Sequence, residues 1–157
     1  MTTAIKKTKL EGVTILLSKE KSEELFHSAL CNGIQIFHQY GLELDYKDVE
    51  YKKAYKSLEA KINKGEIPIG MIVFSGEKPT ICREDAWMEM LRLGYELKVV
   101  DNENDGEYNR SIKLADVNNR VQETPLNHLA DEINEDGDAI TADVILQTVF
   151  FQDVVFG

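Results

Sequence analysis

The segment YELKVVDNENDGEYNRSIKL, residues 95–114, decides the fold of this 157-residue chain. Two runs within it, Tyr95–Val100 and Tyr108–Leu114, are rich in the β-branched and aromatic residues that strands prefer. The residues between them are polar and include Asp105 and Gly106, a pair typical of tight turns between antiparallel strands. The segment therefore predicts a β-hairpin.

The segments around the hairpin favour helices. After Ser18, a residue suited to cap a helix, apolar side chains recur at helical spacing from Phe26 to Phe37, and Gly41 ends the pattern. Thr124 followed by proline is the clearest helix start, because threonine can cap a helix and proline fits its first position. The other predicted helices follow Asp45 and Asp48, cover 84–93, and begin at Asp138 or Thr141.

Strands and helices follow one another in irregular order, which favours an α+β fold over repeated βαβ units. We expect a single α+β domain over residues 10–157, with a mixed or antiparallel sheet that contains the 96–114 hairpin and about five helices. Short strands are also predicted over 10–17, 67–74 and 154–156. Residues 1–9 are polar and basic and are expected to form a flexible arm.

The negative charge of the chain is concentrated in its C-terminal third. The formal net charge is −10, and residues 1–98 hold fifteen basic and fifteen acidic side chains. Residues 101–157 hold three basic and thirteen acidic ones. Duplex binding needs clustered Lys and Arg, so this third is not expected to bind nucleic acid directly. No apolar run approaches the roughly twenty residues of a membrane span and no secretion signal is present, so the expected location is the cytoplasm.

Two cysteines and two histidines between residues 27 and 82 are candidate metal ligands or redox residues. Cys31 and Cys82 fit no zinc or redox spacing and are expected to be reduced and packed, with a disulfide as the alternative. His27, Cys31 and His38 project in similar directions from the first helix, but the histidines are about 16 Å apart along its axis. One ion cannot bridge that distance, so we interpret the three residues as the edge of the core stripe, with His27 and Cys31 as two ligands of a metal ion as the alternative. The acidic residues interpreted as a solvated helix face are Glu84, Asp85 and Glu89.

The most suggestive chemical pattern is an acidic loop with the spacing of a calcium-binding loop. Gly137 occupies the position of the sharp turn, and predicted helices lie on both sides. The oxygen ligands that the spacing predicts are Glu132, Asn134, Asp136, Asp138 and Asp143. Glu132 and Asp143 differ from the usual residues at the first and last ligand positions. The alternative is an acidic turn in which Asp138 caps the last helix.

Two C-terminal segments carry a resemblance. The segments EYNRSIKLADV, residues 107–117, and TADVILQTVFF, residues 141–151, followed by DVVFG at 153–157, resemble a family of small uncharacterised tailed-bacteriophage proteins. One member is encoded beside the DNA ligase gene of T-even phages. The resemblance covers residues 107–157 and transfers no catalytic residues, because the family carries no assigned activity. It implies a small protein made inside the infected bacterium and dispensable for virion structure.

The leading functional hypothesis is a non-enzymatic phage-encoded binding protein that acts on a host protein, as a host-takeover factor or counter-defence inhibitor. It rests on the acidic third, the phage resemblance and the lack of a catalytic or cofactor motif. The residues expected to meet a basic partner surface are Asp131, Glu132, Glu135 and Asp136. One alternative is a solvated acidic face that only maintains solubility. The others are a metal-binding protein or small metal-dependent enzyme that uses the 132–143 acidic loop, and a small-ligand pocket lined by Tyr or Trp.

Overall fold

The computed structural model describes residues 15–71, 76, 77 and 79–157 of the chain. Its first described element is the long helix α2, Lys19–Gln39. Ser18 caps this helix as predicted, because its hydroxyl accepts a hydrogen bond of 3.0 Å from the Lys21 backbone N–H. The helix ends before Gly41, whose φ of +78° suits glycine. The predicted stripe from Phe26 to Phe37 is buried.

The described sheet is antiparallel and has three strands in the order β1-β2-β3. Strands β2, Leu97–Asp101, and β3, Arg110–Ile112, form the predicted hairpin. The second strand ends two residues earlier than predicted, and a helix already begins at Leu114. Strand β1, Leu42–Asp45, was not predicted; it pairs with the edge of β2 opposite β3. It is only four residues long and closely follows α2, so the alternation of apolar and polar residues that marks a strand is too short to detect.

The hairpin loop is closed by the Asp101 side chain. Its carboxylate accepts hydrogen bonds from three backbone N–H groups, at Glu103, Asn104 and Tyr108. Burial alone would raise the pKa of Asp101, but these bonds lower it below the ordinary value. Asp105 and Gly106 both have positive φ, as the predicted Asp-Gly turn requires. The loop therefore has its own internal polar framework.

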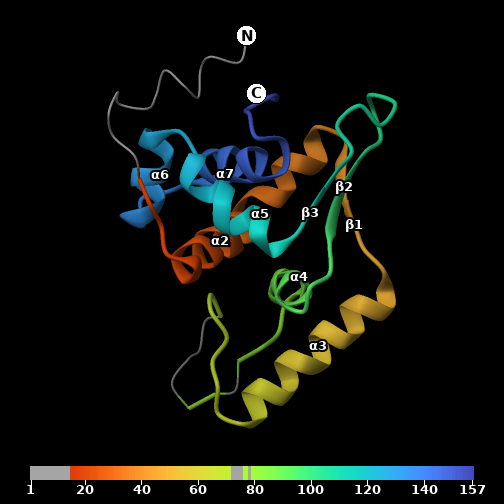
Figure 1. Cartoon of the computed structure of the whole chain (residues 1–157), viewed down its shortest axis with the longest axis vertical. Helices are drawn as coiled ribbons and strands as arrows, with labels where there is room; N and C mark the ends of the chain where they lie inside the picture. Colours follow the sequence, from red (N-terminus) through yellow and green to blue (C-terminus); the bar gives the residue numbers. More distant parts are fainter. Residues whose placement is uncertain (1–14, 72–75, 78) are drawn as a thin grey trace.

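Helices α3, Asp48–Asn63, and α4, Arg83–Arg92, pack against each other away from α7 (Figure 1). A buried ion network joins them to α2. Glu89 of α4, fully buried, lies 2.7 Å from Lys61 Nζ and 3.3 Å from Arg92 Nη1. Arg92 Nε in turn donates to Glu23 Oε1 at 2.8 Å. The prediction that Glu89 belongs to a solvated face is therefore wrong, because basic residues of two helices compensate its buried charge.

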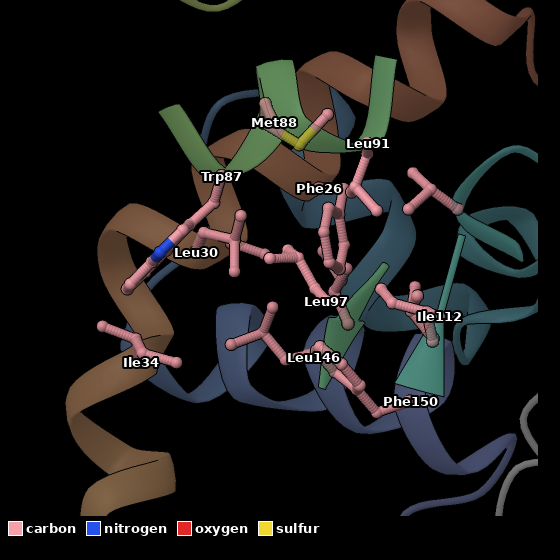
Figure 2. Close-up of a cluster of buried hydrophobic side chains, with 14 of the residues drawn as sticks. Phe26, Leu30, Ile34, Trp87, Met88, Leu91, Leu97, Ile112, Leu146 and Phe150 are labelled. Carbon is pink, nitrogen blue, oxygen red and sulfur yellow. The ribbon is translucent and has the colours of Figure 1, made fainter. Parts of the chain in front are cut away.

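The C-terminal segment forms four helical elements that return the chain to α2. These are α5, Leu114–Arg120, the 3₁₀ turn η1, Val121–Glu123, α6, Leu126–Ile133, and α7, Ala139–Phe151. Helix α7 has the most extensive contact with α2. Gly33 permits this contact, since a Cβ there would lie 2.9 Å from the Ala142 carbonyl carbon. Figure 2 shows the resulting core, to which α2, α4, β2, β3 and α7 all contribute side chains.

Several local predictions were wrong. Thr124 does not cap α6: the cap position belongs to Pro125 without a side-chain bond, and the buried Thr124 hydroxyl has no partner among the described residues. The described parts of the predicted strands 10–17 and 67–74, residues 15–17 and 67–71, contain no strand. Residues 10–14 and 72–74, like the predicted arm 1–9, lie outside the described residues. Residues 154–156 form no strand: the Gln147 side chain bonds the backbone of Val155 and Phe156, and the Val154 N–H bonds Asp153 Oδ1. The α+β single-domain fold itself is confirmed.

Candidate functional site

The segment Asp131–Asp138, called the acidic segment below, comprises the last three residues of α6 and the connection to α7. A backbone bond of 2.8 Å from Asp136 N–H to the Asp131 carbonyl closes it, and Glu135 takes a left-handed φ of +63°. Asp138 caps α7 by accepting a 2.9 Å bond from the Thr141 N–H, which lowers the pKa of Asp138. The side chains of the segment that are exposed include Asp131, Glu135, Asp136 and Asp138.

The structure separates the predicted metal ligands. Glu132 Oε1 accepts a 2.9 Å bond from Ser28 Oγ of α2. Asp143 is buried in α7, where its Oδ2 accepts bonds from the Tyr40 hydroxyl at 2.8 Å and Gln147 Nε2 at 3.0 Å. Asp138 serves as the cap, as the alternative interpretation states, and Asn134 is exposed. Across the described residues, no group of three or more His, Cys, Asp or Glu side chains could hold a metal ion. The structure does not bring the five predicted ligands together, so the metal site stays a prediction.

The partner-binding residues predicted from the sequence do lie together. Asp131, Glu135 and Asp136 form no ion pair with any residue that the structure describes. Their charges are therefore uncompensated locally and open to solvent. Glu132 is half-buried and belongs to the bond with Ser28. Electrostatically, the segment is a compact source of negative potential.

A second candidate site is a pocket of about 440 Å³ between α2 and the start of α4. The sequence did not indicate it, and its described lining contains none of the Tyr or Trp side chains expected of a ligand pocket. At its wall His27 Nε2 lies 2.6 Å from Asp85 Oδ1, and both residues are buried. The residues that line it are Glu24, His27, Ser28, Cys31, Asn32, Gly70, Glu77, Pro79, Thr80, Cys82 and Asp85.

Hydrogen bonds fix the charge state of Asp85. Burial raises the pKa of this carboxyl, but bonds from His27 and from the Cys82 N–H and Sγ outweigh burial and lower it below the ordinary value. Asp85 is therefore ionised at neutral pH and can only accept, so His27 Nε2 donates to it. In the neutral imidazole, Nδ1 is then left as an acceptor. That edge of the ring lies against Gly70, where a Cβ would come 2.6 Å from Nδ1.

The interpretation of Asp85 as a solvated residue is wrong, since only 5% of it is exposed. Nothing in the sequence indicates this burial, because Asp85, Glu89 and Arg92 share one helix face and a charged face is ordinarily solvated. His27 lies 58 positions from Asp85 along the chain, so no local pattern reveals the pair either.

The two thiols in the pocket are kept protonated. Both are free, as predicted, but both are exposed rather than packed. Although Cys31 as a whole is exposed, its sulfur is partly enclosed, and this desolvation, with the negative charges of Glu84 and Asp85, raises the pKa of Cys31 to about 12. Burial and the bond to Asp85 raise the pKa of Cys82 to about 11. A thiol nucleophile needs a lowered pKa, so neither cysteine is suited to catalysis.

Comparison of the chain with protein-family models, with curated proteins and with solved structures found no match. Within the part of the chain that the structure describes, none of the helices combines the length and apolar character that crossing a membrane requires. The functional argument therefore rests on the chemistry of the acidic segment and the pocket.

Proposed function

We propose that this is a non-enzymatic, phage-encoded binding protein that acts on a host protein in the bacterial cytoplasm. Its role would be host takeover or inhibition of a defence factor, with no direct contact to nucleic acid. The observation that carries the proposal is the acidic segment, in which Asp131, Glu135 and Asp136 are exposed and unpaired among the described residues. The resemblance of residues 107–157 to small tailed-phage proteins supports the phage origin.

The geometry of the acidic segment suits recognition of a basic surface. Its backbone is held at both ends, by the Asp136 to Asp131 bond and by the Asp138 cap of α7. The carboxylates therefore project from an ordered turn, so binding needs to order their side chains but not the backbone that carries them. Complementary charge of this kind raises the association rate with a basic partner.

The experiment compares two variants of equal charge. The test variant carries Asp131→Asn, Glu135→Gln and Asp136→Asn. The matched control carries Glu103→Gln, Asp105→Asn and Glu107→Gln, three exposed changes in the hairpin loop. Each protein, with the parent, is used to capture partners from a bacterial lysate, and the captured proteins are identified by mass spectrometry.

We expect the parent and the control to capture one basic-surfaced host protein that the test variant captures weakly. With the purified partner, the association rate should fall steeply with salt for the parent and control, because the Debye length shrinks from about 10 Å at 0.1 M to about 3 Å at 1 M. Equal loss in both variants would mean that only net charge matters. Equal capture by all three proteins would show that the segment is merely solvated.

A further inference from the structure

The pocket between α2 and α4 combines a buried polar wall with an acidic rim. The wall is the His27–Asp85 pair, and Glu24 and Glu77 lie on the more exposed part of the lining. Among the described lining residues there is no Lys or Arg. We propose that this pocket binds the cationic head of a small organic molecule, an alkylguanidinium or alkylammonium group.

The charges around the pocket favour a cation over an anion or a neutral group. Glu24 shares its charge with Lys21, whose Nζ lies 3.1 Å away, whereas Glu77 forms no ion pair with a described residue. Desolvation is the main cause of the raised pKa of both thiols, and the negative charges of Glu84 and Asp85 raise it further. The negative potential of these two carboxylates stabilises a cation at the same place.

The lining also supplies the acceptors that such a head group needs. Both Asp85 oxygens are already engaged, Oδ1 by His27 and Oδ2 by Cys82. Acceptors for the ligand are then the side-chain oxygens of Ser28 and Asn32. Pro79 and the Thr80 methyl provide apolar contact for an alkyl chain. A guanidinium, with five N–H donors in one plane, matches several acceptors at once.

The cation could arrive free in solution, as a small amine, or as an Arg or Lys side chain of another protein. The pocket adjoins the acidic segment, because Ser28 of its lining donates to Glu132. A partner that met the acidic segment could therefore place a basic side chain here. The site does not depend on that partner, however, and would bind a free cation even if the acidic segment bound nothing.

The test uses two-dimensional NMR of the full-length, isotope-labelled protein. n-Butylguanidinium and n-butylammonium are titrated into the millimolar range, with n-butylurea as the neutral, nearly isosteric comparison. We expect saturable shifts of amide signals within residues 27–32 and 79–85 for the two cations and none for the urea. No saturable shift, or an equal response to butylurea, would overturn the proposal.

Variants locate the site and keep the proposal falsifiable. Glu24→Gln with Glu77→Gln should weaken butylguanidinium binding roughly fivefold, since each exposed ion pair contributes modestly. Glu20→Gln, exposed on α2 outside the pocket, should bind like the parent. Thr80→Arg should abolish binding by placing a guanidinium in the pocket. Unchanged binding in the double variant and in Thr80→Arg would contradict the site.

A final arm distinguishes the sources of the cation. A capped Gly-Arg-Gly peptide and its citrulline counterpart are titrated beside butylguanidinium. Tighter binding of the arginine peptide assigns the pocket to a protein side chain, and tighter binding of the free cation assigns it to a small molecule. Either result supports the site, whereas equal binding of the arginine and citrulline peptides contradicts it. None of these outcomes depends on the lysate capture.

Discussion

Burial raises the pKa of two aspartates, Asp85 and Asp143, yet their net pKa shifts are opposite. Asp85 receives three hydrogen bonds, two of them from Cys82, and its pKa is lowered. Asp143 receives two bonds on one oxygen, while its Oδ1 is buried without a partner in the described structure. Desolvation therefore dominates, and the pKa of Asp143 is raised. The same residue type stabilises the fold at one site and costs stability at the other.

Asp85→Asn should destabilise the protein by about 2 kcal/mol near neutral pH, because bonds to a charged acceptor are lost. A lowered folded pKa means that this contribution is present above the ordinary pKa of 3.8 and disappears as the pH falls through the folded value. Urea denaturation of parent and variant over a pH series measures it. The difference between their free energies of unfolding should become smaller below pH 3.8. A difference that does not depend on pH would contradict the charged state of Asp85.

Asp143→Asn should have the opposite sign. The amide oxygen can still accept from Tyr40 and Gln147, and the cost of burying a charge is removed, so we expect a gain of about 1 kcal/mol near neutral pH. A raised folded pKa means that the cost in the parent appears as the pH rises through and above 3.8 and is absent below it. The same urea series should show the gain growing with pH; a loss at every pH would contradict this account.

Two helix starts that look alike in sequence differ in whether a hydroxyl side chain caps the helix. Ser18 caps α2 with a hydroxyl bond, whereas Thr124 precedes α6 with its hydroxyl buried and unpartnered among the described residues. The difference arises because Thr124 ends the η1 turn and faces inward. A hydroxyl can cap a helix only if the preceding chain lets it reach the free N–H groups.

Ser18→Ala should therefore lower the free energy of unfolding by about 1 kcal/mol. Thr124→Val, which keeps the shape and removes the unpartnered hydroxyl, should leave stability unchanged or raise it by up to about 1 kcal/mol. Thermal or urea denaturation of both variants distinguishes them. A loss of stability in Thr124→Val comparable with that in Ser18→Ala would show that the threonine hydroxyl does cap α6.

The C-terminal tail is hydrogen-bonded to α7 through the side chain of Gln147. Gln147, fully buried, accepts bonds from the Val155 and Phe156 N–H groups and donates to the Phe156 carbonyl. Tyr40 stacks on Phe156 with ring centroids 4.7 Å apart. The amide group of Gln147 thus gives the tail the hydrogen bonds that a neighbouring strand would give, and this explains why the predicted strand at 154–156 does not form.

Gln147→Leu should release the tail, because an apolar side chain of similar size cannot make these bonds. Hydrogen exchange at the Val155 and Phe156 amides should become fast, with a stability loss of about 3 kcal/mol from several lost bonds. Gln35→Leu, at an exposed position of α2, should change neither quantity. Continued protection of the two amides in Gln147→Leu would mean that aromatic stacking alone holds the tail.

For the whole molecule, local patterns could predict the hairpin and the buried stripe of α2. Each lies within a short segment whose composition and spacing are visible in the sequence. The pairing of β1 with β2 and of His27 with Asp85 could not be predicted, since both join residues more than fifty positions apart. The interhelical turn in which Asp138 caps α7, stated from the sequence as the alternative to a metal loop, is observed, because its signals are local. The pocket was missed, because its lining comes from distant segments.

The placement of β1 has a consequence for how fast the chain folds. Asp45 pairs with Lys98, and the intervening residues contain α3 and α4. The hairpin and the single helices can form from neighbouring residues within microseconds. Strand β1 can pair with β2 only after a loop of more than fifty residues has closed. We infer that docking of β1 is a late event on the folding pathway. Substitutions in β1, such as Leu44→Ala, should then speed unfolding far more than they slow refolding.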